Sequence, residues 1–372
     1  MMERTRILFY IGSLQSGGKE RRLIELLSYL KKKGTYELML VVTKDEVHYP
    51  DFYKLDIPYQ AIGSIGKNNY AALISRFYKI CKEFKPHLIH TWGRIQSLYT
   101  LPTVIGQRVP LINSQITAAP PRVNKWTLDY LIDKLNFHFS KVILSNSRAG
   151  IDTYNPPLAK GRIIYNGINL NRFINLTSTE QVKAKYGITT PYTVVMSASF
   201  SPNKDYNLFY RVATLVTKCR KDVTFIGVGA CHNKEEFKKL LNLNSNNPRI
   251  LLPGRIDDVE ALVNASTIGV LFSNKAIHGE GISNSIMEYM ALSKPVIAND
   301  AGGTKEILRH HENGYLIENE TAEEIAALIL ELISDEIKCQ SFGRVSRSII
   351  ENSFSLEKMG QEFEQVYKSA LT

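Results

Sequence analysis

The sequence predicts an α/β protein with two Rossmann-like domains, each built on a parallel sheet between helices. Short apolar runs alternate with amphipathic helical segments along the whole chain, which is the pattern of consecutive βαβ units. The chain has 372 residues, more than one hydrophobic core usually supports, so two domains are expected. We assign residues 1–168 to the first domain, 190–350 to the second and 351–372 to a C-terminal helix.

The first βαβ unit opens at residues 6–11, a short apolar run typical of a buried parallel strand. A loop that ends in Gly17 and Gly18 follows, and it leads into a helix predicted at residues 19–33. A strand, a glycine loop and a helix place backbone amides where a phosphate can bind. The loop does not read GxGxxG, so a dinucleotide site is only weakly indicated. A simple tight turn that needs positive φ is the other interpretation.

Further strands of the first domain are predicted at residues 38–42, 58–62, 86–92, 110–115 and 142–145, with a helix at 70–85. His90 lies at the polar C-terminal end of the 86–92 strand. Open α/β sheets bind ligands at these strand ends, which makes His90 a candidate site residue. A hydrogen-bonded structural histidine accounts for it equally well.

Residues 120–139 combine aromatic and basic side chains. The members are Arg122, Lys125, Trp126, Tyr130, Lys134, Phe137 and Phe139. Such a segment suits the lip of an acceptor site or a helix that lies on a membrane surface. Packing of the aromatic rings in a core explains them as well, so the three interpretations stay open.

The second domain begins with a strand at residues 192–198, a loop that contains Lys204 and a helix from Tyr206. Strands are also predicted at 223–229, 249–255 and 267–272, and helices at 259–264, 322–333 and 356–371, with one more opening at 301–306. Asp257 and Asp258 precede the 259–264 helix, where acidic residues are favourable. They lack the Asp-x-Asp spacing of a metal site.

Residues 273–301 hold an acidic loop, a helix start, a buried helix and a buried strand in one block. Ser283 is a good N-cap for a helix at residues 284–292, so Glu280 lies just before the helix and Glu288 within it. The first-turn amides, next to the small Gly281, suit a phosphate, yet two carboxylates would repel one. A nucleotide diphospho-sugar resolves the conflict, because its phosphates take the amides and its hydroxyls donate to the carboxylates.

The spacing from Glu280 to Glu288, within EGISNSIMEYMALSKPVIANDAGG, closely resembles the Glu-x7-Glu pattern of retaining GT-B glycosyltransferases of glycosyltransferase family 4. The resemblance implies two Rossmann-like domains facing a central cleft, with the donor on the second domain, the acceptor on the first, and a final helix crossing back to the first. It also implies transfer of a hexosyl or N-acetylhexosaminyl group from a nucleotide diphospho-sugar to a hydroxyl of a growing glycan or lipid-linked acceptor, with retained configuration. The setting would be cell-surface polysaccharide or glycolipid biosynthesis.

The resemblance also implies roles for individual residues. The catalytic candidates are Glu280, which would hold sugar hydroxyls, Lys204, which would face the diphosphate, and His90. The donor-binding set is Gly17, Gly18, Lys204, Arg255, Glu280, Gly281, Ile282, Ser283 and Glu288, the last at the ribose. No metal and no cofactor are expected, because the nucleotide diphospho-sugar is a substrate and leaving-group charge would meet cationic and amide donors.

Two positions depart from the family pattern. Ser199 stands where relatives carry an arginine five residues before the lysine, so half of the expected positive charge is missing, and Arg255 is the first candidate to replace it. Gln115 stands where many relatives end a strand on a histidine that approaches the donor sugar. Gln115 could hydrogen-bond a hydroxyl instead.

Basic residues are concentrated in the first half. Residues 1–170 carry 24 Lys and Arg against 12 Asp and Glu, a net +12; subtraction from the totals of 46 and 36 leaves 22 against 24, a net −2, for residues 171–372. The first domain is expected to contact an anionic membrane or a phosphorylated lipid, with an incidentally basic surface as the alternative. No apolar run is long enough to span a bilayer, and the four scattered cysteines indicate reduced thiols. We therefore expect a cytoplasmic protein, or one peripheral on the inner face of the membrane.

Three other functions are weighed against the transferase. A GT-B sugar-nucleotide epimerase would share the architecture but release a free sugar, and the charge bias of the first half argues against it. A non-catalytic nucleotide-sugar-binding protein would account for Ser199 and Gln115 as signs of lost activity. Nucleic-acid binding is not expected, because the basic residues belong to no recognised nucleic-acid module.

Overall fold

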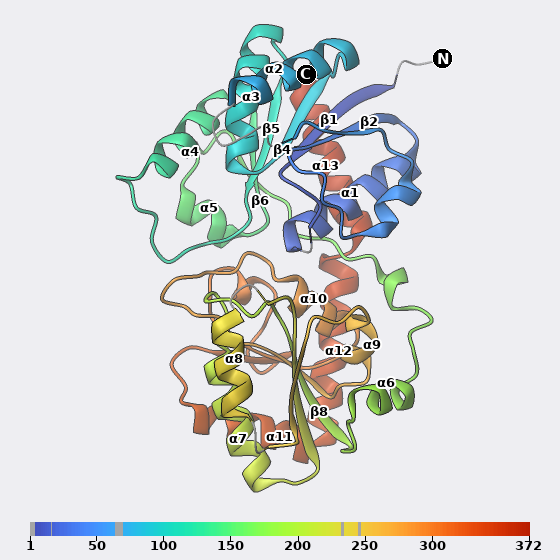
Figure 1. Cartoon of the computed structure of the whole chain (residues 1–372), viewed down its shortest axis with the longest axis vertical. Coiled ribbons are helices and arrows are strands. Elements are labelled where there is room, and N and C mark those ends of the chain that lie inside the picture. Colours follow the sequence, from blue (N-terminus) through green and yellow to red (C-terminus); the bar gives the residue numbers. More distant parts are fainter. Residues whose placement is uncertain (1–3, 16, 64–69, 232–233, 245–246) are drawn as a thin grey trace. The chain divides into compact units, whose positions relative to one another are not determined.

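The computed structural model describes residues 4–15, 17–63, 70–231, 234–244 and 247–372 (Figure 1). Contacts divide the chain into two compact units, Met1–Gly167 together with Leu356–Thr372, and Ile168–Ser355. Each unit is built on one parallel sheet flanked by helices. The prediction of two Rossmann-like α/β domains is confirmed.

The first unit contains a seven-stranded sheet in the order β3-β2-β1-β4-β5-β6-β7, and all neighbouring strands are parallel. Its strands are β1 (Thr5–Ile11), β2 (Tyr36–Val42), β3 (Tyr59–Ala61), β4 (Leu88–Trp92), β5 (Leu111–Ile116), β6 (Val142–Ser145) and β7 (Gly161–Ile163). Its helices are α1 (Gly18–Lys33), the 3-10 helix η1 (Pro50–Leu55), α2 (Tyr70–Phe84), α3 (Arg94–Gln107), α4 (Leu128–Phe139), α5 (Arg148–Tyr154) and α13 (Leu356–Leu371).

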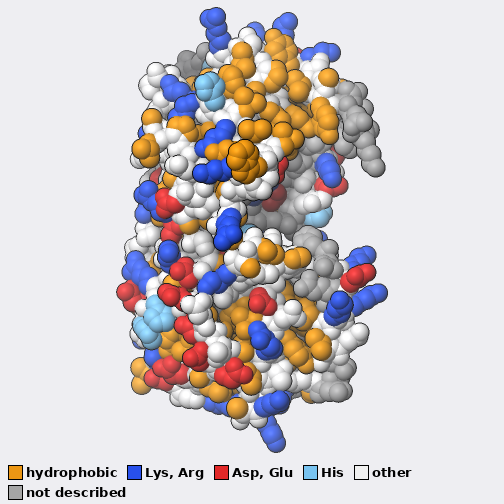
Figure 2. Space-filling view, turned by 90° about the vertical axis from the view of Figure 1, so that its left-hand side faces the viewer, with side chains coloured by type: hydrophobic (Ala, Val, Ile, Leu, Met, Phe, Trp, Pro, Cys, Tyr) orange, Lys and Arg blue, Asp and Glu red, His pale blue; other side chains and the backbone are white. Residues whose placement is uncertain are grey.

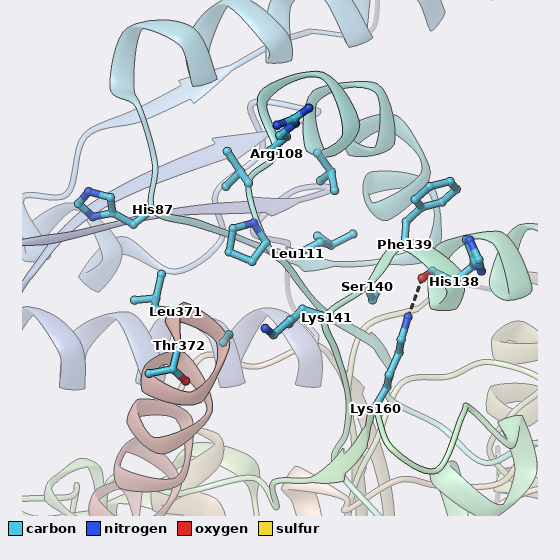
Figure 3. A pocket seen from close by; sticks show the side chains of 14 residues that line it. His87, Arg108, Leu111, His138, Phe139, Ser140, Lys141, Lys160, Leu371 and Thr372 are labelled. Atoms are coloured by element: carbon cyan, nitrogen blue, oxygen red, sulfur yellow. Dashed lines mark hydrogen bonds between the residues drawn. The ribbon is translucent and has the colours of Figure 1, made fainter.

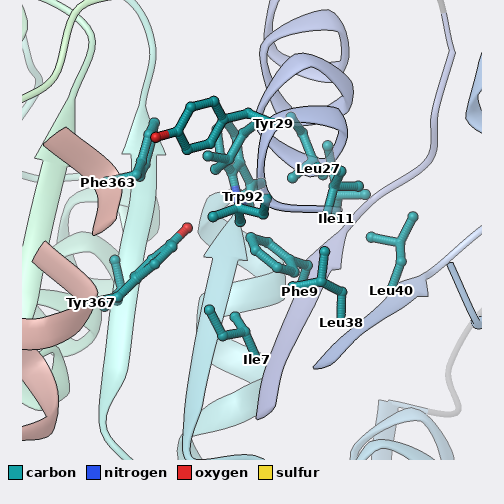
Figure 4. Close-up of a cluster of buried hydrophobic side chains, with 14 of the residues drawn as sticks. Ile7, Phe9, Ile11, Leu27, Tyr29, Leu38, Leu40, Trp92, Phe363 and Tyr367 are labelled. Carbon is teal, nitrogen blue, oxygen red and sulfur yellow. The ribbon is translucent and has the colours of Figure 1, made fainter. Parts of the chain in front are cut away.

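The last helix, α13, packs into the core of the first unit. Figure 4 shows Phe363 and Tyr367 among side chains from β1, β2, β4 and α1. Gly360 allows a close approach to α1, because a Cβ there would lie 2.4 Å from ring atoms of Tyr29. The hydroxyl of Tyr29 in turn donates to Glu364 at 2.9 Å. The apolar side of α13 therefore covers part of the sheet of the first unit.

The second unit contains a six-stranded parallel sheet in the order β10-β9-β8-β11-β12-β13. Its strands are β8 (Tyr192–Ser197), β9 (Val223–Val228), β10 (Ile250–Gly254), β11 (Ile268–Leu271), β12 (Val296–Asn299) and β13 (Gly314–Ile317). Its helices are η2 (Leu170–Phe173), α6 (Thr179–Tyr186), α7 (Tyr206–Cys219), α8 (Lys234–Leu243), α9 (Val259–Asn264), α10 (Asn284–Ala291), η3 (Thr304–Glu306), α11 (Ala322–Ser334) and α12 (Glu336–Ser353).

Some elements differ from those expected. The helix predicted to open at residues 301–306 is only the short 3-10 helix η3, with Gly303 as its N-cap. Residues 169–189, left between the predicted domains, lie in the second unit and form η2 and α6, and Ile168, assigned to the first domain, also lies in the second unit. The 18-residue helix α12 was not predicted.

No helix in the described part of the chain is both long enough and apolar enough to cross a membrane.

Candidate active site

The second sheet reverses its strand order between β8 and β11. In open parallel sheets a ligand binds beyond the carboxyl ends of the strands at such a point. The chain leaves β8 at Ser197 into a loop that carries Lys204, and it leaves β11 at Leu271 into a loop that carries Glu280. Two predicted site residues thus start from neighbouring strands at the switch point.

The side chains of Lys204 and Glu280 form an ion pair, and only 13% and 11% of their respective surfaces are exposed. Ser273 Oγ donates to the same carboxylate oxygen at 2.6 Å, and His278 Nε2 lies 3.5 Å from it. Burial by itself would raise the pKa of Glu280, but the Lys204 ammonium and His278 outweigh it and hold the pKa well below its ordinary value. Glu280 is therefore an ionised carboxylate that can only accept hydrogen bonds.

Main-chain contacts hold these loops in place. An antiparallel bridge joins Lys204 to Ser273, and a parallel bridge joins Glu280 to Gly302. The N–H of Glu280 donates to the carbonyl of Ala301 at 3.1 Å. The loops after β8, β11 and β12 consequently form one connected support for the ion pair.

Helix α10 begins immediately after this support. Gly281 and Ile282 are buried just ahead of the helix, and Ser283 occupies the N-cap position. The Ser283 side chain makes no capping hydrogen bond, although serine is favoured there for that purpose. The positive end of the helix dipole is thus presented beside the Lys204–Glu280 pair.

Close packing fixes the position of α10 against the sheet. The N–H of Ser197, at the end of β8, donates to the buried Tyr289 hydroxyl at 2.6 Å. Gly269 in β11 makes room for this ring, since a Cβ there would lie 2.3 Å from its atoms. Helix α10 therefore cannot shift along β8 and β11 without breaking these contacts.

Glu288 lies in α10 and is buried, as is Glu280, with 9% of its side chain exposed. Its carboxylate is 3.1 Å from Arg172 Nη2, and the same guanidinium nitrogen also pairs with Glu260. Arg172 was not among the predicted site residues. Its position in the Asn-Arg-Phe stretch of η2 carries no chemical signal, because Glu288 follows more than a hundred residues later.

Ser199, which stands in place of the expected arginine, contacts another serine and no positively charged side chain in the described part of the chain. Ser199 Oγ is 3.1 Å from Ser201 Oγ. Arg255 is exposed and follows β10 on the far side of β9 from β8, at the same edge of the sheet as Lys204. The structure does not bring Arg255 into the Lys204–Glu280 cluster, whereas it brings Arg172 to Glu288.

Gly17 and Gly18 lie in the first unit, at the start of α1. Gly17 is the N-cap and is extended (φ −168°), so a turn that requires positive φ does not account for it. Its N–H donates to the Tyr49 hydroxyl at 3.0 Å. The two glycines therefore open a helix whose first turn lies beyond the carboxyl end of β1, as expected from the sequence.

His90 and Gln115 are both engaged within the first unit. His90 is fully buried, with Nδ1 2.9 Å from the Tyr367 hydroxyl and Nε2 2.8 Å from Ser114 Oγ. Burial and the nearby Arg22 guanidinium hold the pKa of His90 well below its ordinary value. This environment favours the structural interpretation of His90 over a catalytic one. Gln115 donates to Asp133 at 2.5 Å rather than presenting its amide to a ligand.

Within the described residues, no cluster of three or more His, Cys, Asp or Glu side chains is arranged to hold a metal ion.

Comparison with known proteins decides the class of this site. Residues 178–348, which include Lys204, Glu280 and Glu288, match the profile of the family "Glycosyl transferases group 1". The chain is 23% identical, over 81% of its length and 79% of the relative's, to N-acetyl-alpha-D-glucosaminyl L-malate synthase of Bacillus anthracis. The protein is a glycosyltransferase.

One further sequence relative and one solved structure resemble this glycosyltransferase. It is 27% identical to poly(ribitol-phosphate) alpha-N-acetylglucosaminyltransferase of Staphylococcus aureus, over 45% of this chain and 34% of that protein. Its fold is that of the crystal structure of Anabaena HepE in complex with UDP and glucose, with a TM-score of 0.86, 20% identity, and coverage of 98% of this chain and 100% of the other. The glycosyltransferase thus has the GT-B architecture, with both Rossmann-like domains matched.

Proposed function

We propose that this glycosyltransferase is a retaining enzyme of family 4 that moves a hexosyl or N-acetylhexosaminyl group from a nucleotide diphospho-sugar to a hydroxyl. The observation that carries the proposal is the Lys204–Glu280 pair at the β8/β11 switch point, next to the N-terminus of α10, where Ser283 makes no side-chain capping bond. One cation, a row of helix amides and a buried carboxylate provide complementary partners for a diphosphate joined to a polyol.

The ion pair also supports a charge-exchange step on donor binding. Without donor, Lys204 and Glu280 neutralise each other in a site that is largely shielded from water. A bound diphosphate would take the Lys204 ammonium, and the sugar hydroxyls would then donate to the Glu280 carboxylate. Neither buried charge is left unpaired at any stage, which avoids the large penalty of an isolated buried ion.

Catalysis would come from stabilising the leaving nucleotide. As the glycosidic bond to the diphosphate lengthens, negative charge grows on the phosphate oxygens, and Lys204 together with the first amides of α10 would stabilise that charge. Glu288, held by Arg172, would accept from the ribose hydroxyls. We assign no covalent intermediate and no metal to this reaction.

The acceptor is proposed to be a growing glycan or a lipid-linked saccharide in cell-surface polysaccharide or glycolipid assembly, at the inner face of the membrane. The names of two relatives, an N-acetylglucosaminyl malate synthase and a poly(ribitol-phosphate) N-acetylglucosaminyltransferase, favour an N-acetylglucosaminyl donor. The net charge of +12 on residues 1–170 favours an anionic acceptor or membrane partner.

Nucleotide release from a panel of UDP- and GDP-sugars, with and without lipid-linked acceptor, tests the proposal. We expect release from one donor, an increase with acceptor, and loss in Lys204→Ala but not in Lys218→Ala, an exposed lysine in the last turn of α7. The coupling constant of the anomeric proton in the product would report retention. If the donor binds but no nucleotide is released under any condition, the protein is a non-catalytic nucleotide-sugar-binding protein. A free sugar product formed without acceptor would indicate an epimerase.

A further inference from the structure

Helix α4 in the first unit exposes three leucines to solvent and buries two polar side chains together with Phe137. Leu128, Leu131 and Leu135 are 72%, 62% and 43% exposed, and their spacing places them on one side of the helix. Asp133 and Asn136, on the opposite side, are 2% and 0% exposed. A helix on the surface of a globular protein normally turns its polar residues outward and its apolar residues inward, whereas α4 buries Asp133 and Asn136 and exposes three leucines.

A polar network holds α4 in this orientation. Arg94 of α3 makes two bonds to the Asp133 carboxylate, at 2.6 and 2.9 Å, and one to Asp129 at 2.7 Å. Gln115 of β5 donates to Asp133 at 2.5 Å and accepts from Asn136 at 2.9 Å. Rotation of α4 to bury its leucines would expose these bonds to water and break them together. The outward leucines are thus a fixed feature of the surface.

Neighbouring segments enlarge the apolar surface. Trp126, in the turn before α4, is 97% exposed, and Leu158, in the loop after α5, is 91% exposed. That loop lies against α4, because Lys134 donates to the carbonyl of Asn155 at 3.3 Å. Figure 2 shows hydrophobic side chains gathered on this side of the first unit, with Lys and Arg side chains beside them. We call Trp126, Leu128, Leu131, Leu135 and Leu158 the α4 apolar face.

Basic side chains bracket the α4 apolar face. Arg122 and Lys125 precede the helix and are exposed. At its C-terminal end lies a cavity of about 710 Å³ lined by Arg108, Lys141 and Lys160, together with His138 (Figure 3). Lys160 is anchored there by a 2.6 Å bond to the carbonyl of His138. An apolar strip with an indole at its edge and cations at both ends matches the layers of an anionic bilayer surface, where acyl chains lie beneath negatively charged headgroups.

We propose that the α4 apolar face inserts into the interfacial region of a membrane that contains anionic lipid. Arg122 and Lys125 before α4, and the basic side chains that line the cavity at its C-terminal end, would contact the headgroups. The inference rests on the proposed function for its biological sense, since a lipid-linked acceptor would be met at that surface. Pairing with a second copy of this chain fits less well. A symmetric contact through this face would bring two sets of like charges together at its margins.

The chain contains a built-in probe for this insertion. Its two tryptophans differ completely in exposure, Trp126 at 97% and Trp92 at 0%. Vesicles of phosphatidylglycerol and phosphatidylcholine in equal amounts should shift the emission of the full chain to the blue and protect it from aqueous quenchers. Vesicles of phosphatidylcholine alone should give a much smaller shift, and Trp126→Phe should abolish the shift with either vesicle.

Variants separate the apolar and the electrostatic contributions. Leu131→Ser combined with Leu135→Ser should lower co-sedimentation with the anionic vesicles by about tenfold, since a loss of 1.4 kcal/mol of burial corresponds to that factor. Ile337→Ser, which removes an 80% exposed isoleucine from α12, is the matched control and should bind as the unaltered chain does. Arg122→Glu combined with Lys125→Glu should remove most of the preference for anionic lipid and its dependence on salt.

Membrane binding and sugar transfer can be tested separately. Donor hydrolysis in the absence of vesicles should be unchanged in the Leu131→Ser, Leu135→Ser variant, because these residues lie outside the proposed donor site. An unshifted emission together with no vesicle binding by the folded chain would overturn the membrane proposal while leaving transfer intact. A blue shift of Trp126 with rising protein concentration and no lipid, accompanied by dimers in sedimentation velocity, would assign the face to a second copy instead.

Discussion

Arg172 Nη2 lies 3.1 Å from Glu288 Oε1, and the same guanidinium pairs with Glu260. An arginine from η2 therefore joins two carboxylates, one on α9 and one on α10, and sets the direction of the carboxylate that we assign to the ribose. Arg172 does not itself contact the donor in this proposal. It is a positioning residue.

Arg172→Ala should raise the donor KM about tenfold with a smaller change in kcat, because the ground-state contact of Glu288 is weakened while the diphosphate contacts remain. The free energy of unfolding should fall by about 1–2 kcal/mol, less than for a fully buried pair. Steady-state kinetics and urea unfolding measure the two effects, with Arg172→Lys as the conservative control that should recover most of the KM. An equal loss of kcat and unchanged KM would contradict the positioning role.

Glu280→Gln should lower the free energy of unfolding by about 3 kcal/mol at neutral pH, because it leaves the Lys204 ammonium without its carboxylate in a buried site. The folded pKa of Glu280 lies below its ordinary value of 4.5, so the stability that it contributes is fully present above pH 4.5 and is lost as the pH falls through the folded pKa. Urea unfolding at several pH values should therefore show the two proteins converging in acid. A difference that is independent of pH would argue against an ionised Glu280.

His90 should make the first unit sensitive to mild acid. Its folded pKa lies well below 6.5, so below pH 6.5 the unfolded chain binds a proton that the folded chain does not. For each unit by which the pH falls below 6.5, the free energy of unfolding should therefore decrease by about 1.4 kcal/mol. Unfolding followed by the fluorescence of Trp92, whose ring lies 5.0 Å from that of His90, measures the slope. His90→Gln should flatten the slope, whereas His138→Gln, which alters an exposed histidine, should retain it.

Gln115 should act through α4 rather than through the donor. Gln115→Ala removes the link between β5 and the polar side of α4. It should lower the free energy of unfolding by about 1–2 kcal/mol. Gln115→Glu should cost more, since it sets a second carboxylate against Asp133 in a buried position. Hydrogen exchange should become faster in residues 128–139 in both variants while β1 and β4 stay protected. Equal protection of α4 in all three proteins would show that the network is not needed to hold the helix.

The periodic parts of the sequence were sufficient to predict most of the fold. Runs such as residues 6–11 and 267–272 are apolar on both faces because they become central parallel strands, and that pattern is visible without coordinates. Helices α3 and α12 were missed for the opposite reason. Their buried sides include Ser97, Thr100 and Thr103 in one and Gly343 and Ser346 in the other, residues that pack closely but carry no hydrophobic signal.

The block around Glu280 and Glu288 could also be read from the sequence, since the N-cap position, the helix and both carboxylates lie within a few residues of one another. The partners of those carboxylates could not. Lys204 precedes Glu280 by 76 positions and Arg172 precedes Glu288 by 116, and contacts over such separations are set by strand order rather than by local pattern.

The sequence alone determined two α/β domains, a helix start flanked by acids, and a basic first half, because each is a matter of composition or short-range spacing. Tertiary structure decided the rest. It buried His90 between Ser114 and Tyr367, and it committed Gln115 to Asp133. It also turned the leucines of α4 outward, because Asp133 and Asn136 on the other side of the helix are bonded to Arg94 of α3 and Gln115 of β5, partners that lie far from α4 in the sequence.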